Sequence, residues 1–98
     1  MFRVTVNSAP DSATMKLEGK LAGPWVEECM RAWLELKRTL STRKLSLDLC
    51  GVTFVDALGM QLLREIYSAT RAELLTNSPL TKHFAEQAMQ HIDGRKGA

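Results

Sequence analysis

Apolar and polar residues alternate in short stretches of the chain, and apolar residues recur at helical spacing in longer ones. A period of two is typical of a half-buried strand, whereas apolar residues three and four positions apart line one face of a helix. The pattern predicts strands over 2–6, 14–18, 45–49 and 73–76. It predicts helices over 24–40, over about 57–70, and from Pro79 onward.

Turn-forming residues separate these segments. Asn7 to Ser12 is rich in turn formers and predicts a hairpin loop between the first two strands. Gly19 to Gly23 predicts a loop before the first helix. Cys50-Gly51 predicts a turn after the third strand, followed by the short apolar run 52–55.

Each predicted helix begins with a suitable residue. Pro24 fits a first helical turn, where its missing N–H has no helical partner to lose. Asp56 is a good N-cap for the second helix, because its carboxylate accepts hydrogen bonds from free N–H groups of the first turn. Asn77 or Ser78 caps the third helix.

One face of each helix is expected to pack inward. The stripes are Val26, Cys29, Met30, Trp33, Leu36 and Leu40 in the first helix, Leu62, Leu63, Ile66 and Tyr67 in the second, and Leu80, Phe84, Ala88 and Ile92 in the third.

The predicted order is strand, strand, helix, strand, helix, strand, helix. A hairpin followed by strand–helix alternation indicates an α/β fold with a mixed four-stranded sheet and helices mainly on one face. The length of 98 residues suits a single domain over 1–98. We expect an ordered core over about 2–92 and a fraying basic tail over 93–98.

Composition excludes several classes of protein. Hydrophobic residues make up 45% of the chain and charged residues 24%, with a net charge of +2, which is unlike a disordered chain or a nucleic-acid-binding one. No apolar run is long enough to span a membrane, and the first residues lack the apolar stretch of a signal peptide, so we expect a cytoplasmic protein. Cys29 and Cys50 fit neither a metal site nor a disulfide framework, and no residue pattern indicates a cofactor.

Two segments carry a resemblance to a known family. Leu17-Glu18-Gly19-Lys20-Leu21 is the shorter, and Leu47-Asp48-Leu49-Cys50-Gly51-Val52-Thr53-Phe54-Val55-Asp56 with Gly59 is the longer and more specific. Together they resemble the STAS domain, the module shared by sulfate transporters and anti-sigma-factor antagonists. The predicted element order agrees with that family over about residues 2–91.

The resemblance implies a bacterial regulator that acts in signal transduction and transcription by binding a protein. In antagonist members an anti-sigma factor that is also a kinase binds the domain and phosphorylates a Ser or Thr directly after the motif aspartate. Here that position is Ala57, and the next residue is Leu58, so neither carries a hydroxyl. The resemblance therefore implies partner binding without phosphorylation switching. The expected partner-binding residues are Asp56, Ala57, Leu58, Gly59, Met60, Gln61 and Arg64.

Other functions stay open alongside this one. STAS-like subunits also dock on the ATPase of membrane lipid-transport complexes, and STAS-like folds have a pocket near the second helix that suits a small ligand. The absence of a glycine-rich loop argues against strong phosphate binding. No arrangement of Ser, His, Asp or Cys indicates an enzyme. Because the chain ends soon after the third helix, an open sheet edge or helix face would favour a homodimer.

Plainer roles compete for several of these residues. Helix capping explains Asp56 without any partner. Gly59 weakens a helix, so the close approach of another chain segment is its expected reason. Leu58 and Met60 suit either an exposed binding surface or packing on the loop at Leu21. We expect glutamate at Met60 or Arg64 to weaken partner binding and leave the fold intact. Trp25 either anchors an interface or covers the edge of the core, and the second is favoured.

Overall fold

The computed structural model describes the backbone of residues 1–97 and the side chains of residues 1–90. Its elements, in chain order, are β1 (Phe2–Ser8), β2 (Ser12–Leu21), α1 (Pro24–Leu40), β3 (Lys44–Val55), α2 (Ala57–Thr70), β4 (Glu73–Leu75) and α3 (Pro79–Gly97). This is the predicted element order. The expected burial of Ile92 lies outside the described side chains. The backbone of α3 is helical as far as Gly97, within the tail over 93–98 that was expected to fray.

The four strands form one mixed sheet in the order β1-β2-β3-β4. β1 and β2 pair antiparallel as a hairpin, while β2 with β3 and β3 with β4 pair parallel. Each parallel pair is joined through a helix, as a crossover between parallel strands requires. The predicted α/β fold with a mixed four-stranded sheet is confirmed.

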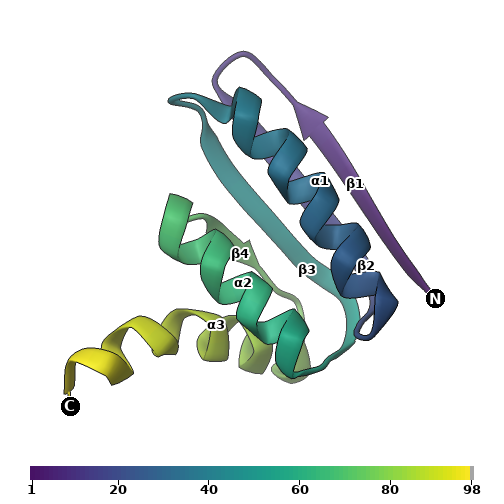
Figure 1. The fold of residues 1–98 in the computed structure, drawn as a ribbon, viewed down its shortest axis with the longest axis vertical. Coiled ribbons are helices and arrows are strands. Elements are labelled where there is room, and N and C mark those ends of the chain that lie inside the picture. The colour runs from purple at the N-terminus through teal and green to yellow at the C-terminus, as the bar shows by residue number, and fades with distance from the viewer. Residues whose placement is uncertain (98) are drawn as a thin grey trace.

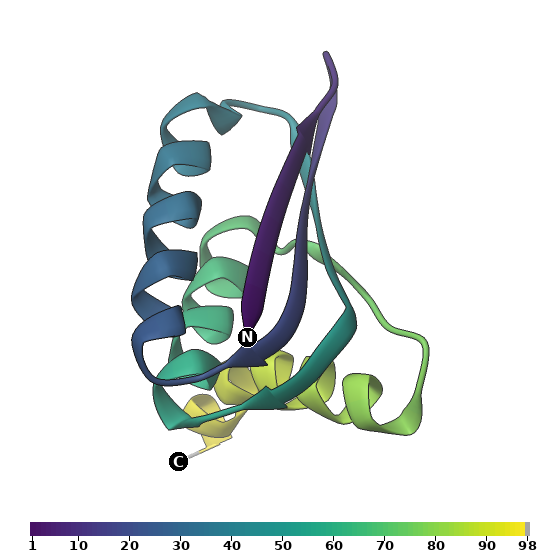
Figure 2. The same cartoon turned by 90° about the vertical axis from the view of Figure 1, so that its right-hand side faces the viewer.

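Two helices form a layer on one side of the sheet. Figures 1 and 2 show α1 and α2 side by side over the same face, while α3 crosses below α2 near the end of β3. Helix α3 contacts both α2 and β3. The N-terminal ends of α1 and α2 both follow the carboxyl ends of strands β2 and β3, so the two helix starts lie at one end of the molecule.

The core lies between this helical layer and the sheet. Alternate residues of β2 and β3 point into it, because successive side chains of a strand face opposite sides. The largest fully buried side chains are Trp33, Met15, Leu17, Leu21, Leu47, Leu49, Leu63, Ile66, Thr81 and Cys29. Trp33 from α1 and Leu63 from α2 therefore fill the space over the centre of the sheet.

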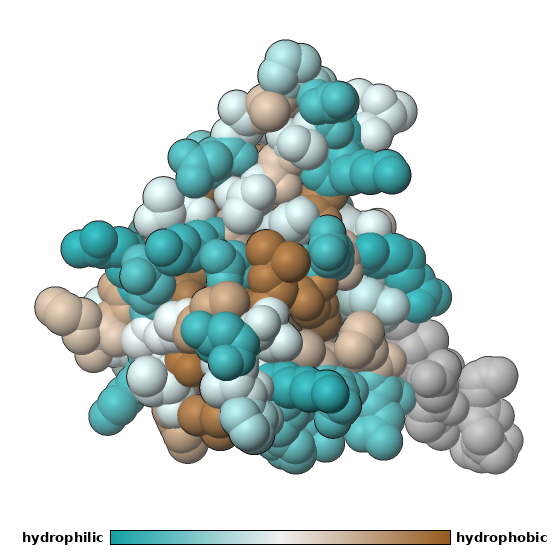
Figure 3. Space-filling model, turned by 180° about the vertical axis from the view of Figure 1, so that it is seen from behind, coloured by the Kyte–Doolittle hydropathy of each residue, from teal (hydrophilic) through white to brown (hydrophobic). Residues whose placement is uncertain are grey.

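The opposite face of the sheet carries mostly polar positions. Lys16 and Asp48 are neighbours across β2 and β3, and Leu75 stands next to Asp48 on β4. All three side chains are half-buried. Figure 3, which views the molecule from behind, shows hydrophilic residues around a smaller hydrophobic area.

The strands extend further than the pattern predicted. β2 runs through Gly19 to Leu21, and β3 continues through Cys50-Gly51 to Val55, where we expected a loop and a turn. The two segments pair with each other, so tertiary hydrogen bonding replaces the local turn. Register shifts within this pairing take up the irregularity, and Gly51 lies so close to the Glu18 side chain that a Cβ would come within 2.8 Å of Cγ.

Two residues predicted to be buried are exposed. Met30 in α1 is 39% exposed and Leu80 in α3 is 48% exposed, although both fit their helical stripes. Met30 lies at the margin of the α1 stripe, and Leu80 lies in the first turn of α3. Tyr67 is half-buried at the edge of the α2 stripe, so its expected packing is partly confirmed.

Helix α3 begins with a reciprocal cap. Ser78 Oγ accepts a hydrogen bond from Thr81 N at 3.1 Å, and Thr81 Oγ1 accepts one from Ser78 N at 3.1 Å. The predicted capping by Ser78 is confirmed. Among the residues that the structure describes, no helix is long and apolar enough to cross a bilayer.

Candidate functional site

Asp56 joins the starts of two helices. Its Oδ1 accepts a hydrogen bond from Gly59 N at 2.7 Å, which caps α2, and its Oδ2 accepts one from Gly23 N at 2.9 Å, at the start of α1. The backbone N–H of Asp56 also donates to Leu21 O at 3.1 Å. The predicted capping role is confirmed, and the same carboxylate also fixes the loop between β2 and α1.

These hydrogen bonds favour the ionised carboxylate. The N–H of Gly23, followed by that of Gly59, lowers the pKa of the Asp56 carboxyl below its usual value. Both bonds come from backbone groups that the helix starts leave without helical partners. Asp56 is therefore negatively charged at neutral pH and satisfied within the chain.

Gly59 lies where two chain segments touch. A Cβ at this position would collide with Leu21 O and would come within 3.1 Å of Val55 Cγ1. The first turn of α2 thus rests directly on the end of β2. The expected reason for Gly59, the close approach of a neighbouring segment, is confirmed.

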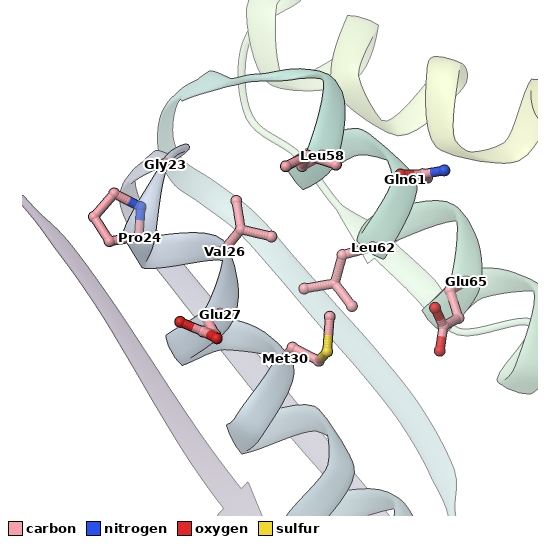
Figure 4. A pocket seen from close by; sticks show the side chains of 9 residues that line it. All are labelled: Gly23, Pro24, Val26, Glu27, Met30, Leu58, Gln61, Leu62 and Glu65. Atoms are coloured by element: carbon pink, nitrogen blue, oxygen red, sulfur yellow. The ribbon is translucent and has the colours of Figure 1, made fainter.

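An open groove lies between the N-terminal halves of α1 and α2, beside this contact. Its volume is about 420 Å³. Figure 4 shows Val26, Met30 and Leu62 pointing into the space between the helices. The residues that line it are Gly23, Pro24, Val26, Glu27, Met30, Leu58, Gln61, Leu62 and Glu65.

The groove combines an apolar floor with an acidic margin. Leu58 is 61% exposed and Met30 is 39% exposed, while Leu62 below them is buried. Its two ionisable residues are both acidic: Glu27 lies on the α1 side and Glu65 on the α2 side (Figure 4). Exposed apolar side chains gathered in a concave surface are typical of an interaction site.

The structure brings together only some of the predicted partner-binding residues. Leu58 and Gln61 line the groove. Ala57 is exposed at the first position of α2. Met60 is half-buried and packs against the core, and Arg64 Nε donates to Gln87 O of α3 at 3.2 Å. Of the two alternatives for Leu58 and Met60, exposure holds for the first and packing for the second.

Several groove residues were not expected as site residues. Val26, Glu27 and Met30 lie on α1, about thirty positions before the motif around Asp56, and only the packing of α1 beside α2 unites them. One feature of the sequence could have indicated that Met30 is a surface residue: it lies at the margin of the apolar stripe of α1. Trp25 is 37% exposed and is not part of the buried core.

Metal ligands and free thiols are the other chemical groups to consider. No three His, Cys, Asp or Glu side chains within the described part of the chain are grouped as metal ligands. Burial raises the pKa of the Cys29 thiol to about 12, so this thiol stays protonated and unreactive.

Comparison with protein-family models gives no match for this chain, and no curated protein matches it either. The structure itself shows a small α/β fold with a mixed four-stranded sheet and three helices.

Proposed function

We propose that this chain is a STAS-like module that binds a protein partner through the groove between α1 and α2. The partner we propose is a kinase-type anti-sigma factor in the cytoplasm, and the role is regulatory rather than enzymatic. The observation that carries the proposal is the exposure of Leu58, which stands 61% open to solvent beside an apolar groove. Because Leu58 lies next to Met30 and over Leu62, a partner that covers it would remove apolar surface from water, and this burial favours binding.

The proposal also includes the absence of a phosphorylation switch. The position directly after Asp56 is Ala57, which is exposed at the start of α2. A hydroxyl here would be accessible to a kinase, and a phosphate would sit at a helix N-terminus. Because alanine carries no hydroxyl, the partner remains bound in the presence of ATP.

The first test is partner capture with matched variants. The full chain is immobilised and exposed to lysate of the source cells, next to Leu58→Glu and Leu80→Glu. Leu80 is a suitable control because it is 48% exposed and lies on α3, away from the groove. We expect an anti-sigma factor bound by the wild type and by Leu80→Glu, and lost with Leu58→Glu.

The second test restores the hydroxyl. With the captured kinase and Mg-ATP, we expect Ala57→Ser to take up phosphate and to release the partner, while the wild type does neither. Capture of a transporter ATPase instead would favour an accessory subunit of a transport complex. Equal capture by all three immobilised proteins would exclude the groove as the docking surface.

A further inference from the structure

β1 forms a long open edge of the sheet. The strand order makes β1 and β4 the two edges, and β4 has three residues whereas β1 has seven. Proteins protect long edges with lysines, prolines or bulges, because an open edge can pair with another strand. β1 contains neither lysine nor proline and only one charged residue, Arg3, and the register shifts of this sheet lie between β2 and β3.

The pairing with β2 fixes which backbone groups of β1 point outward. The carbonyl oxygen of Met1 accepts a hydrogen bond from Lys20 N at 3.1 Å, so Met1 faces β2. Orientation alternates along an antiparallel strand. The N–H and C=O groups of Phe2, Val4, Val6 and Ser8 therefore point away from β2.

The side chains of β1 leave apolar surface at this edge. Val4 is the partner of Leu17 and Val6 that of Met15, so both face the side of the sheet that α1 covers. The cover is incomplete, because Val6 is 39% exposed and Val4 is half-buried. Two shallow hollows lie between β1 and α1, and Ala32 borders both of them.

We infer that a second copy of this chain pairs with β1, antiparallel, about a twofold axis at Thr5. This register overlaps the two strands over their full length. It sets Val4 against Val6 of the second copy, Thr5 against Thr5, and Arg3 against Asn7. Any register with Arg3 opposite Arg3 would oppose like charges and shorten the overlap.

The charged residues of α1 are also compatible with a second copy of this chain at the β1 edge. Helix α1 lies over β1 and β2, so the α1 helices of the two copies would run antiparallel roughly 10–14 Å apart, two to three strand spacings. Glu28, Arg31 and Glu35 border the hollow next to Val4. The antiparallel arrangement about Ala32 brings Arg31 of one copy toward Glu35 of the other.

Trp25 adds an apolar side chain to this surface. It precedes Ala32 by seven residues, so both lie on the same side of α1. Its 37% exposure is then explained by the second copy rather than by the core of the single chain. Exposed tryptophans are enriched among the residues that anchor interfaces.

The dimer surface and the proposed partner groove lie on opposite sides of α1. Ala32 faces β1, whereas Met30 faces α2. A dimer leaves the groove open, so either proposal can fail without the other.

The association is tested by sedimentation equilibrium of the full chain over a concentration series. We expect a monomer–dimer equilibrium that Val6→Lys weakens about tenfold or more, because the lysine blocks the edge. Leu80→Lys, which adds the same charge on α3, is expected to dimerise like the wild type. A wild-type chain that stays monomeric at the highest concentration overturns the inference.

The register is tested by cross-linking in a Cys50→Ser background. Residues facing each other at a non-hydrogen-bonded antiparallel pair are about 4.5 Å apart between Cα atoms, within the range of a disulfide. We expect Thr5→Cys to form a covalent dimer on mild oxidation and Asn7→Cys, opposite Arg3, to remain uncoupled. Equal coupling at both positions, or none at position 5, overturns the proposed pairing.

Discussion

The carboxylate of Asp56 accepts a hydrogen bond from the backbone of Gly23, 33 residues earlier in the chain, at 2.9 Å. Through its other oxygen the same group caps α2 at Gly59. One side chain thereby sets the positions of two helix starts relative to each other. The groove between α1 and α2 is bounded by those two starts, so its shape depends on Asp56.

Asp56→Asn is expected to lose the bond to Gly23 and to keep the cap on α2, because asparagine also caps helices well. Both bonds lower the pKa of the folded carboxyl, so their contribution to stability is complete above the unfolded value of about 3.9 and declines as pH falls through the folded value. Urea unfolding should show the largest difference between wild type and variant near pH 7 and a smaller one below pH 4. A difference that does not vary with pH would contradict this origin.

Gly59→Ala is expected to destabilise the fold, although alanine is favoured over glycine in a helix by up to about 1 kcal/mol. The added Cβ collides with Leu21 O, and the first turn of α2 must shift. We expect a net loss of about 1–3 kcal/mol in the free energy of unfolding, as for other overpacked sites. Ser68→Ala, at an exposed position of the same helix, should change stability by about 0.5 kcal/mol or less.

Glutamate at Met60 and at Leu58 is expected to act differently. Met60 packs against the core, so Met60→Glu buries part of a charged group and should cost about 1–3 kcal/mol of stability. Leu58 is exposed, so Leu58→Glu should change stability by no more than about 0.5 kcal/mol. Thermal unfolding of the two variants beside wild type measures the difference. Equal stability of both would place Met60 on the surface.

Cys50 is expected to react with thiol reagents more slowly than an ordinary exposed cysteine. The Asp48 side chain raises the pKa of the Cys50 thiol, first through hydrogen bonding, and the thiolate is the reactive form. Asp48→Asn should speed the reaction with Ellman's reagent several-fold at pH 8, while Asp11→Asn, in the hairpin loop, should not. Cys50→Ser identifies the reacting thiol, because Cys29 is buried and should react only on unfolding. An unchanged rate in Asp48→Asn would exclude this influence of Asp48.

The local pattern of apolar and polar residues was sufficient to predict the helices and strands and their order. Alternation over 45–49 placed Leu45, Leu47 and Leu49 on the buried side of β3, and all three are buried. Asp56 marked the start of α2 because capping depends on residues only three positions apart. These features could be predicted because strand periodicity and helix capping are decided within a few neighbouring residues.

Features that join distant segments could not be predicted in this way. The sequence indicated a turn at Cys50-Gly51, but pairing with β2 keeps β3 extended to Val55, because ladder hydrogen bonds outweigh a local turn preference. Met30 fits the buried stripe of α1, but it is exposed because it lines the open groove between α1 and α2. Likewise Leu58 and Met60 look equivalent in the sequence, and only the direction of each around α2 separates them.

The sequence by itself therefore determined the α/β class, the element order and the cap at Asp56. The tertiary structure decided that Leu58, Met30 and Gln61 border one groove, that Arg64 is held by α3, and that β1 is the long open edge. The physical reason is the range of the forces involved. Periodicity and capping act along the chain, whereas a groove or an edge exists only where separate elements meet or end.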